Sequence, residues 1–436
     1  MGGAKEAVIS AASFLVFAFL DLLDFCLCFF YMFVDSVLED NPAPCFCRNR
    51  GAAEQGMPGV DHEGNGEISE TLYERRSMFR LQAVFCSNKE EGVVTKEKEK
   101  KMCRRRPRRL PRWSDCSCET CFSLPDWAGK KPEKLYFVIK ETNPAAAAQV
   151  QDLCQNVIFL HGFLSSSSFW VDSVFPNISQ GSNTKVKMFA VDLLGFGRSP
   201  KPVNCSYTIR DQLEGIYTSV IKEFKLGSFH IVAHSMGCIL ALALAAEFPD
   251  SVKSITLVAP PYFSSLEDKA SHNVLNRIAE RKIWPPLLFG CSVMSWYEHL
   301  GRTICFLFCR NHSMWEGIMK LLMWKGQLPS SMLDLTKHTH QSAWHTMHNV
   351  VCGGAKVMDK YLKTLKGEDI LIKIIQGSKD QVVPLECSYN MKGRFPQAEL
   401  QIIHNADHTT VILDRKKDFT RDLEEIWSTS SLTHKH

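Results

Sequence analysis

The chain has 436 residues, of which 45% are apolar, and it carries a formal net charge of +4 at pH 7. This length and apolar content allow one large domain with a sizeable core, together with extensions. A charge this small for the length argues against a nucleic-acid-binding protein. The 17 cysteines are scattered and odd in number, so they do not predict a disulfide framework.

The N-terminus is strongly apolar from residue 7 to residue 37, which is long enough to cross a bilayer as a helix. Asp21, Asp24 and Asp35 interrupt this stretch, and each would be costly at the centre of a membrane. Residues 1–45 are therefore predicted to be a signal peptide or a membrane anchor, with a soluble amphipathic helix as the alternative. Such a segment would direct the chain into the secretory pathway. The expected location is then the cell wall or extracellular space, or the plasma membrane as an anchored protein. Three Asn-x-Ser sequons are compatible with this route: Asn177, Asn204 and Asn311.

Residues 46–131 are rich in Gly, Pro and charge and lack a sustained apolar period, which predicts a disordered basic linker. The arginines between residues 104 and 109 concentrate its positive charge. A nuclear-localisation signal or a patch for an anionic surface is one interpretation, but a solvated disordered segment is favoured. Cys116, Cys118 and Cys121 form a C-x-C-x-x-C cluster whose thiolates are suitable zinc ligands. No second pair of ligands follows at zinc-finger spacing, so no metal site is predicted.

Beyond residue 132, strand-like and helix-like patterns alternate, which predicts an α/β domain over residues 132–430 with a mostly parallel central sheet flanked by helices. Residues 262–368 carry Trp, Phe, Met and Leu in helical blocks without a confident strand, which predicts a helical lid over an apolar site. Strands are expected at residues 135–140, 156–160, 187–193, 229–233, 252–259, 370–376 and 400–403. Four histidines of the lid are expected to have structural or gating roles rather than to bind metal: His338, His340, His345 and His348.

The most informative stretch is Ser228–Ala241, SFHIVAHSMGCILA. An apolar run suited to a buried strand ends at a His-Ser-Met-Gly turn, and an Ala- and Leu-rich run suited to a helix begins at Cys238. A serine on such a turn has the form of a nucleophile elbow, G-x-S-x-G, with Ser235 as the nucleophile. The turn aims the N–H of Met236 at the substrate oxygen. Ala233 stands at the first small position and is a methyl group larger than the usual Gly.

Other strand ends carry the remaining candidate residues. The strand ending at residue 160 is followed by His-Gly-Phe, where the N–H of Phe163 is the predicted second oxyanion donor. Asp380 follows a later strand in a turn, where an acid can reach a histidine, and His408 follows the last strand. Asp192 is instead predicted to cap a turn, and Asp407 is too near His408 in the chain to face it.

The sequence resembles the α/β-hydrolase superfamily over residues 135–427 through HGF at 161, DLLGFGRSP at 192, AHSMG at 233, GSKDQVVP at 377 and NADHT at 405. The order Ser235, Asp380, His408 is that superfamily's Ser…Asp…His order. More narrowly, the apolar N-terminus with its basic linker, HGFLSSSSFW at 161 and AHSMGCILALALA at 233 resemble the plant BODYGUARD family. That resemblance implies an extracellular, lysophospholipase-like or ester-handling enzyme connected with the epidermal cuticle and its cutin. It also implies that Ser235, Asp380 and His408 are the catalytic residues.

The expected reaction is serine-dependent hydrolysis of lipid carboxylic esters, such as lysophospholipids or cutin-type esters, without a metal or organic cofactor. His408 would accept the Ser235 proton while Asp380 holds the imidazole, and the N–H groups of Phe163 and Met236 would hold the oxyanion. An acyltransferase or polyester synthase would use the same residues with an alcohol as acceptor, and a ligand receptor on this fold would bind without turnover. The expected partners are the ester substrate and a membrane or cell wall; no nucleic acid is expected, and no protein partner is identified.

Overall fold

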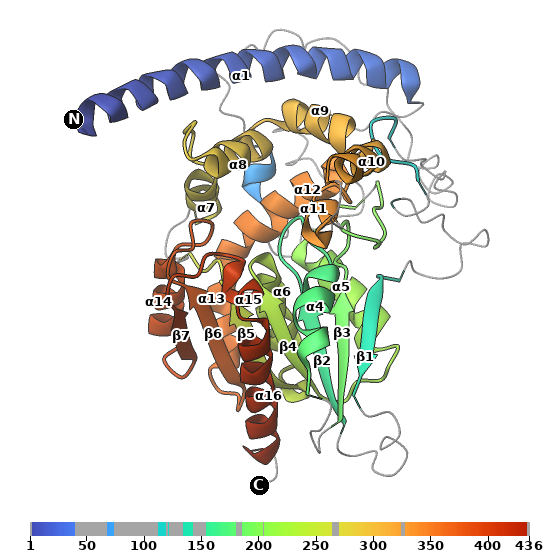
Figure 1. Ribbon diagram of the computed structural model, residues 1–436, viewed down its shortest axis with the longest axis vertical. Helices are drawn as coiled ribbons and strands as arrows, with labels where there is room; N and C mark the ends of the chain where they lie inside the picture. Colours follow the sequence, from blue (N-terminus) through green and yellow to red (C-terminus); the bar gives the residue numbers. More distant parts are fainter. Residues whose placement is uncertain are drawn as a thin grey trace, which may run out of the picture.

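In the part of the chain that the computed structural model describes, seven strands form one sheet (Figure 1). The described residues are 2–39, 68–73, 112–118, 121, 134–142, 154–179, 185–203, 205–263, 270–323 and 328–433. The strands are β1 (Phe137–Glu141), β2 (Cys154–Leu160), β3 (Lys185–Val191), β4 (Phe229–His234), β5 (Val252–Val258), β6 (Leu371–Gly377) and β7 (Glu399–Ile403). Their order is β1-β3-β2-β4-β5-β6-β7, and only the β1–β3 pairing is antiparallel. The predicted fold class is confirmed, and each expected strand ends within two residues of an observed one.

The central strands are buried on both faces, which is why they consist of continuous apolar runs rather than alternating patterns. Every residue of β4 is buried, and so are the last four residues of β2. The parallel registers pair Leu160 with Ala233 and Gly377 with Ile403, so the loops that follow β2, β4, β6 and β7 leave the same edge of the sheet. Strands β3 and β4 lie on opposite sides of β2, and ligands of open α/β sheets bind where the strand order reverses in this way.

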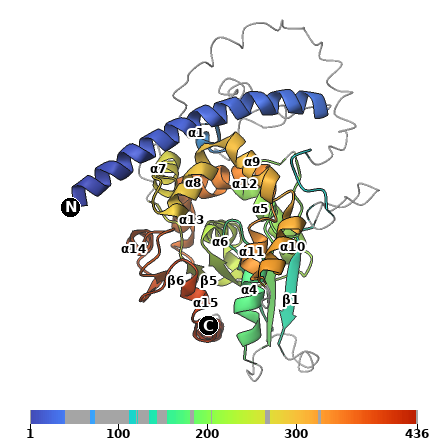
Figure 2. The ribbon, with the colours of Figure 1, turned by 45° about the horizontal axis from the view of Figure 1, so that its top comes forward.

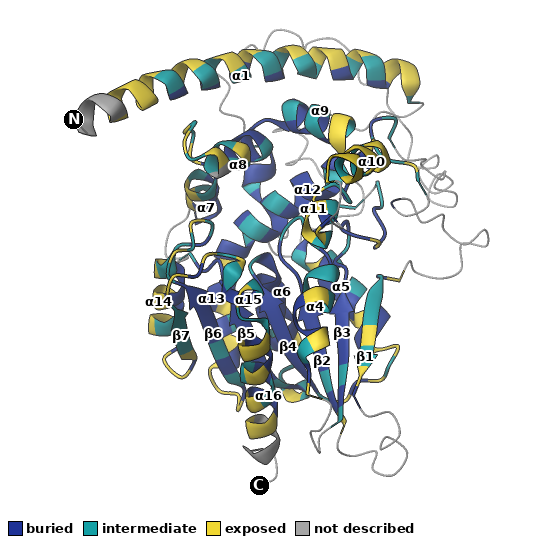
Figure 3. Cartoon of the chain, viewed as in Figure 1, coloured by how far each residue is buried: buried dark blue, intermediate teal, exposed yellow. Residues whose placement is uncertain are grey.

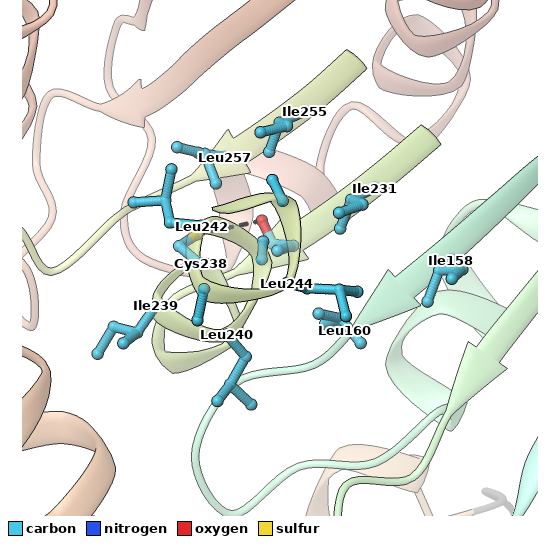
Figure 4. Close-up of a cluster of buried hydrophobic side chains, with 14 of the residues drawn as sticks. Ile158, Leu160, Ile231, Cys238, Ile239, Leu240, Leu242, Leu244, Ile255 and Leu257 are labelled. Atoms are coloured by element: carbon cyan, nitrogen blue, oxygen red, sulfur yellow. Dashed lines mark hydrogen bonds between the residues drawn. The ribbon is translucent and has the colours of Figure 1, made fainter. Parts of the chain in front are cut away.

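Helices cover both faces of the sheet. Helix α6 (Met236–Glu247) is apolar all round because it is enclosed between the sheet and α13 (Gly353–Leu365), and its residues 236–245 are buried. Figure 4 shows the side chains of β2, β4 and β5 gathered around α6. Helices α5 (Ile209–Ile216) and α14 (Leu385–Arg394) contribute to this same core. The opposite face is covered by α4 (Ser168–Ser173), α15 (Thr410–Leu413) and α16 (Lys416–Thr433).

The expected helix over residues 208–224 is present as α5 followed by a π-helical turn, Tyr217–Ile221. Its start is fixed by a capping box, because Asp211 N donates to Thr208 Oγ1 at 3.2 Å and Thr208 N donates to Asp211 Oδ2 at 2.8 Å. Short single-turn 3-10 helices connect other elements: Phe175–Asn177 and Pro249–Ser251.

The interval predicted to be a lid is helical in its described residues (Figure 2). Its helices are α7 (Ala270–Ile278), α8 (Pro286–Trp296), α9 (Glu298–Phe308), α10 (His312–Leu322), α11 (Ser330–Asp334), α12 (His340–Thr346), a π-helical turn (Met347–Cys352) and α13. Helix α13 differs from the others because Met358, Leu362 and Leu365 belong to the main core beside α6. It is therefore one of the helices that cover the sheet, and the name lid is kept below for the helices that precede it, from α7 to the π-helical turn at 347–352.

Helix α1 (Gly2–Leu38) lies across the lid (Figures 1 and 2), and the acids that interrupt its apolar sequence bind lid residues. Asp21 accepts hydrogen bonds from Arg281 Nη2 and from Tyr297 Oη, both at 2.8 Å. Asp24 Oδ1 accepts the backbone N–H groups of residues 299 and 300, both at 2.9 Å, and so caps the start of α9. These acids are satisfied by the lid, which explains their presence in an apolar helix.

Asp35 forms the third contact, a bidentate pair with Arg302 at 2.6 and 2.7 Å, and also accepts from Trp113 Nε1 at 2.6 Å. Burial alone would raise the pKa of Asp35, but the hydrogen bonds and charge of Arg302 outweigh it and lower that pKa. The opposite side of α1 is exposed (Figure 3), with Phe14 at 64% and Phe33 at 70%. Helix α1 is long and apolar enough to span a membrane by length and composition.

Two pieces of the predicted disordered linker are ordered and packed, which corrects that prediction for them. The 3-10 helix η2 (Glu70–Tyr73) buries Thr71 and Leu72, and Trp113 packs edge-on against Phe306 at 5.3 Å between ring centroids. These pieces have few apolar residues of their own, and tertiary contacts supply what the sequence pattern lacked. The arginine run at 104–109 and Asn204 lie outside the described residues.

Candidate active site

Ser235 occupies the turn between β4 and α6 with φ 53° and ψ −122°. A non-glycine residue in such a conformation costs on the order of 1–3 kcal/mol and is held there by its surroundings. Ser235 N–H donates to Val258 O at 2.8 Å, and Cys238 N–H donates to Ser235 O at 2.9 Å. A Cβ on Gly237 would lie 2.7 Å from Leu160 O, so only glycine allows the helix to approach β2 this closely. Ala233 is fully buried within β4, which accommodates its methyl group.

The structure brings Asp380 and His408 together. His408 Nδ1 lies 2.8 Å from Asp380 Oδ2, and the Asp380 side chain has no exposed surface. Asp380 Oδ1 accepts the N–H groups of Val382 and Val383 at 2.8 and 2.9 Å. This arrangement fixes the carboxylate in a turn after β6 and leaves Nε2 of His408 as the ring nitrogen available for proton transfer.

Gln376 also holds this carboxylate and was not predicted from the sequence. It is fully buried at the end of β6, where Nε2 donates to Asp380 Oδ2 at 3.0 Å and to Val383 O at 3.1 Å. Its own Oε1 accepts from Ser388 Oγ at 2.8 Å. A polar residue in the buried second half of the strand, four residues before the acid, was the available signal.

His234, next to Ser235 in the chain, positions the loop of His408. Its Nε2 donates to His408 O at 2.8 Å, and the two rings lie 4.7 Å apart between centroids. Burial, reinforced by the nearby His408, lowers the pKa of His234 to about 3, so its ring is neutral at physiological pH. Phe169 also stacks on the His234 ring, at 5.0 Å between ring centroids. His234 therefore connects the elbow to the histidine loop without competing for a proton.

The predicted oxyanion donors come from the loop after β2 and from the start of α6. A Cβ on Gly162 would lie 3.2 Å from Ser235 Cβ, which places the residues around Phe163 beside the elbow. In the described residues, neither Phe163 nor Met236 has a hydrogen bond to its backbone N–H. His161 holds the loop in place, because its Nδ1 donates to Gly162 O at 2.7 Å and its Nε2 accepts from Leu193 N–H at 2.9 Å. Burial lowers the pKa of His161, consistent with this neutral form.

Asp192 and Asp407 both cap turns; this role was predicted for Asp192, whereas Asp407 was predicted only not to face His408. Asp192 accepts the N–H groups of Ser167 at 2.6 Å and Arg198 at 2.7 Å. Asp407 Oδ1 accepts the N–H groups of Thr409 and Thr410 at 2.9 and 2.8 Å. Neither is the hydrogen-bond partner of the His408 ring.

The lid is attached directly to the loops around the site. Asp334, on α11, accepts a hydrogen bond from Ser166 Oγ at 2.7 Å, in the loop after Phe163, and another from Ser168, the first residue of α4. Ser342 Oγ, on α12, donates to Gly195 O at 2.9 Å. These contacts connect the lid to the loops that follow β2 and β3.

The four lid histidines singled out from the sequence are buried, and three of them have identifiable contacts within the polypeptide. His345 Nδ1 lies 3.3 Å from Ser206 O, His348 Nδ1 lies 3.0 Å from Thr71 Oγ1, and His340 lies beside Gly301. Burial lowers the pKa of His345 to about 4. His338 differs, because its Nε2 faces the sulfurs of two cysteines of α9.

Comparisons with known proteins agree with this architecture. The family profile described as "alpha/beta hydrolase fold" matches residues 155–281. The chain is 46% identical to "Probable lysophospholipase BODYGUARD 4" of Arabidopsis thaliana, over 97% of both chains. It is 44% identical to "Probable lysophospholipase BODYGUARD 5" of the same plant, over 98% of this chain and 96% of that one. A solved carboxylesterase structure from Nitrososphaera gargenis is 16% identical, covers 69% of this chain and 96% of its own, and gives a TM-score of 0.44. The chain therefore belongs to the BODYGUARD family, a family of carboxylic ester hydrolases with the α/β-hydrolase fold.

Proposed function

We propose that the protein is a serine hydrolase of lipid carboxylic esters, with Ser235 as nucleophile, His408 as general base and Asp380 as the acid that orients it. The observation that carries this proposal is the combination of a strained serine at the elbow with an Asp380–His408 hydrogen bond of 2.8 Å to a carboxylate that has no exposed surface. A strained backbone is retained where the surroundings over-determine it, and such positions cluster at active sites.

In the proposed mechanism, Ser235 Oγ attacks the ester carbonyl as His408 Nε2 accepts its proton. Asp380 accepts from Nδ1–H and stabilises the imidazolium that forms. The N–H groups of Phe163 and Met236 bind the oxyanion, and loss of one such donor typically costs about 10²–10³ in rate. His408 then protonates the leaving alcohol, and water, activated by the same histidine, releases the acid from Ser235.

The proposed substrates have a long acyl chain and a polar head, as lysophospholipids and cutin-type esters do. The names of the BODYGUARD relatives support the former. The exposed side of α1 supports action at a lipid surface, because it presents large apolar side chains on a helix whose acids are bound to the lid: Val8, Phe14, Leu15, Phe19, Phe33 and Val37. We infer that the mature chain keeps α1, rests this side on a membrane and reaches cuticle lipids through the secretory pathway.

The catalytic proposal is tested with a fluorophosphonate probe and with the Ser235→Ala variant. The wild-type chain is expected to be labelled on Ser235 and to release free fatty acid from a lysophospholipid, and S235A is expected to show neither. Labelling that persists in S235A would contradict the assignment. Transfer of the acyl group to an added alcohol in place of free acid would identify the acyltransferase alternative.

The membrane proposal is tested by N-terminal sequencing of the secreted chain and by vesicle flotation. The chain is expected to retain α1, and Phe14→Ser with Phe33→Ser is expected to reduce flotation while hydrolysis of a short-chain soluble ester stays at the wild-type rate. A mature chain that begins after residue 38 would overturn the retention of α1.

A further inference from the structure

The C-x-C-x-x-C cluster of the linker meets a histidine of the lid. His312, the first residue of α10, lies 191 residues beyond Cys121 in the sequence, yet its ring reaches the cluster. The ligand atoms of Cys116, Cys118, Cys121 and His312 all lie within 4.8 Å of one another. We propose that these four residues bind a structural zinc ion that fastens the linker to the lid.

The distances suit a shared metal. His312 Nε2 lies 3.3 Å from Cys118 Sγ and 3.5 Å from Cys121 Sγ. Tetrahedral zinc, with Zn–S of about 2.3 Å and Zn–N of about 2.0–2.1 Å, separates sulfur from nitrogen by about 3.5 Å. A single imidazole nitrogen offers one proton or one lone pair, so it satisfies at most one of the two sulfurs by a hydrogen bond. One metal ion at their centre satisfies all of them.

The histidine is held in the tautomer that zinc requires. His312 Nδ1 lies 3.1 Å from Glu316 Oε1, one helical turn along α10. A carboxylate at that distance accepts the Nδ1 proton, which leaves the lone pair of Nε2 directed at the sulfurs. Metal-bound histidines are oriented by such a second hydrogen bond to a carboxylate or carbonyl.

The surroundings favour a structural role. Cys121 and His312 are each about 5% exposed, and Trp113, three residues before Cys116, contacts both Asp35 of α1 and Phe306 of α9. Four protein ligands close the coordination sphere, so no position is open for water or substrate. Zinc binding would thus stabilise the folded position of this polar segment, which has few apolar side chains of its own to bury.

A neighbouring cluster on α9 provides an internal comparison. The sulfurs of Cys305 and Cys309 each lie 3.5 Å from His338 Nε2, and all three residues are buried. This cluster has three such donors in the described residues, and His338 Nδ1 has no hydrogen-bond partner there to fix the ring. It lacks the fourth donor and the orienting carboxylate that distinguish the His312 site.

The proposal is tested on the full chain, purified from a secretory host without chelators, by mass-spectrometric zinc analysis. The variants Cys118→Ser and His312→Gln are each expected to lose one zinc per chain relative to wild type. Cys291→Ser, a matched change on the lid helix α8 outside both clusters, is expected to keep the wild-type content. Zinc that stays in C118S and H312Q but is lost from Cys305→Ser would overturn the assignment.

A second measurement needs no variant and covers the case in which the variants fail to fold. In the wild-type chain, Cys116, Cys118 and Cys121 are expected to resist alkylation until a zinc chelator is added, as read by peptide mapping. Equal alkylation with and without the chelator would refute the proposal. A disulfide between any two of the three cysteines in the secreted chain would refute it as well. Neither readout depends on ester hydrolysis, so this proposal and the proposed function fail separately.

Discussion

The change Asp380→Asn tests the proposed site most directly, because the structure dictates how the new amide must lie. Oδ1 of Asp380 accepts two backbone N–H groups, from Val382 and Val383. An amide nitrogen placed there would face two backbone donors, which are fixed by the turn. At the Oδ2 position it would face the side chains of His408 and Gln376, whose hydrogen-bonding groups can rearrange, so the asparagine oxygen keeps the Oδ1 position. The NH₂ group then occupies the Oδ2 position and points at His408 Nδ1, 2.8 Å away in the wild type.

His408 responds by changing tautomer. To accept from the amide, Nδ1 must give up its proton, which moves to Nε2 and removes the lone pair that would accept the Ser235 proton. Loss of the correct tautomer in a Ser-His-Asp site typically lowers kcat by about 10⁴, which corresponds to roughly 5.5 kcal/mol of transition-state stabilisation. We expect a loss of this size while the fold is unchanged.

The assay is kcat for a short-chain p-nitrophenyl ester, with circular dichroism as the check on folding. Asp407→Asn is the matched control, one residue from His408 in the same loop. Asp407 Oδ1 accepts two N–H groups and the Thr409 hydroxyl of the following turn, and an amide oxygen still does so. We expect D407N to stay within a few-fold of wild type. A D380N enzyme that retains more than about a tenth of wild-type kcat would refute the reasoning. A tenfold loss corresponds to only about 1.4 kcal/mol of transition-state stabilisation, far below the expected loss.

Three further outcomes are expected. The free energy of unfolding of Ser235→Gly should exceed that of Ser235→Ala by about 1–3 kcal/mol, because glycine tolerates φ 53°, and its denaturant midpoint should be higher. An equal or lower midpoint would show that Ser235 is unstrained. The free energy of unfolding should fall as the pH drops below 6.5, because the unfolded chain then protonates His234 and His345 while the folded chain, with pKa values of about 3 and about 4, does not. Each should contribute about 1.4 kcal/mol per pH unit, so urea titrations of His345→Gln should show a shallower pH dependence than wild type, and an unchanged slope would contradict this. Asp35→Ala should destabilise the lid region by about 3–5 kcal/mol by leaving Arg302 buried and unpaired, which hydrogen exchange of α9 would detect; the paired change with Arg302→Met should recover most of the loss, and no recovery would argue against the ion pair.

Local sequence was sufficient for the features that depend on neighbouring residues in the chain. The strand–turn–helix around Ser235, the acid in the turn after β6 and the histidine after β7 each lie within a short segment whose apolar pattern predicts the elements on either side. Parallel strands then bring those ends to one edge, so the order of motifs was enough to predict that they meet. The polar Gln376 in a buried strand was overlooked because its partner is decided by the turn that follows it.

Tertiary structure alone decided which distant segments complete each other. The sequence predicted three isolated cysteines without a metal, and the fold supplies His312 from the far side of the chain. The sequence also showed three acids in an apolar helix, each of which would be costly to bury without a partner. The lid provides their partners, which are Arg281, Arg302 and the N-terminus of α9. The physical reason is the same in both cases: a ligand or a counter-charge is recognised by its distance in space, and local periodicity carries no information on how a helical lid folds back over residues hundreds of positions earlier.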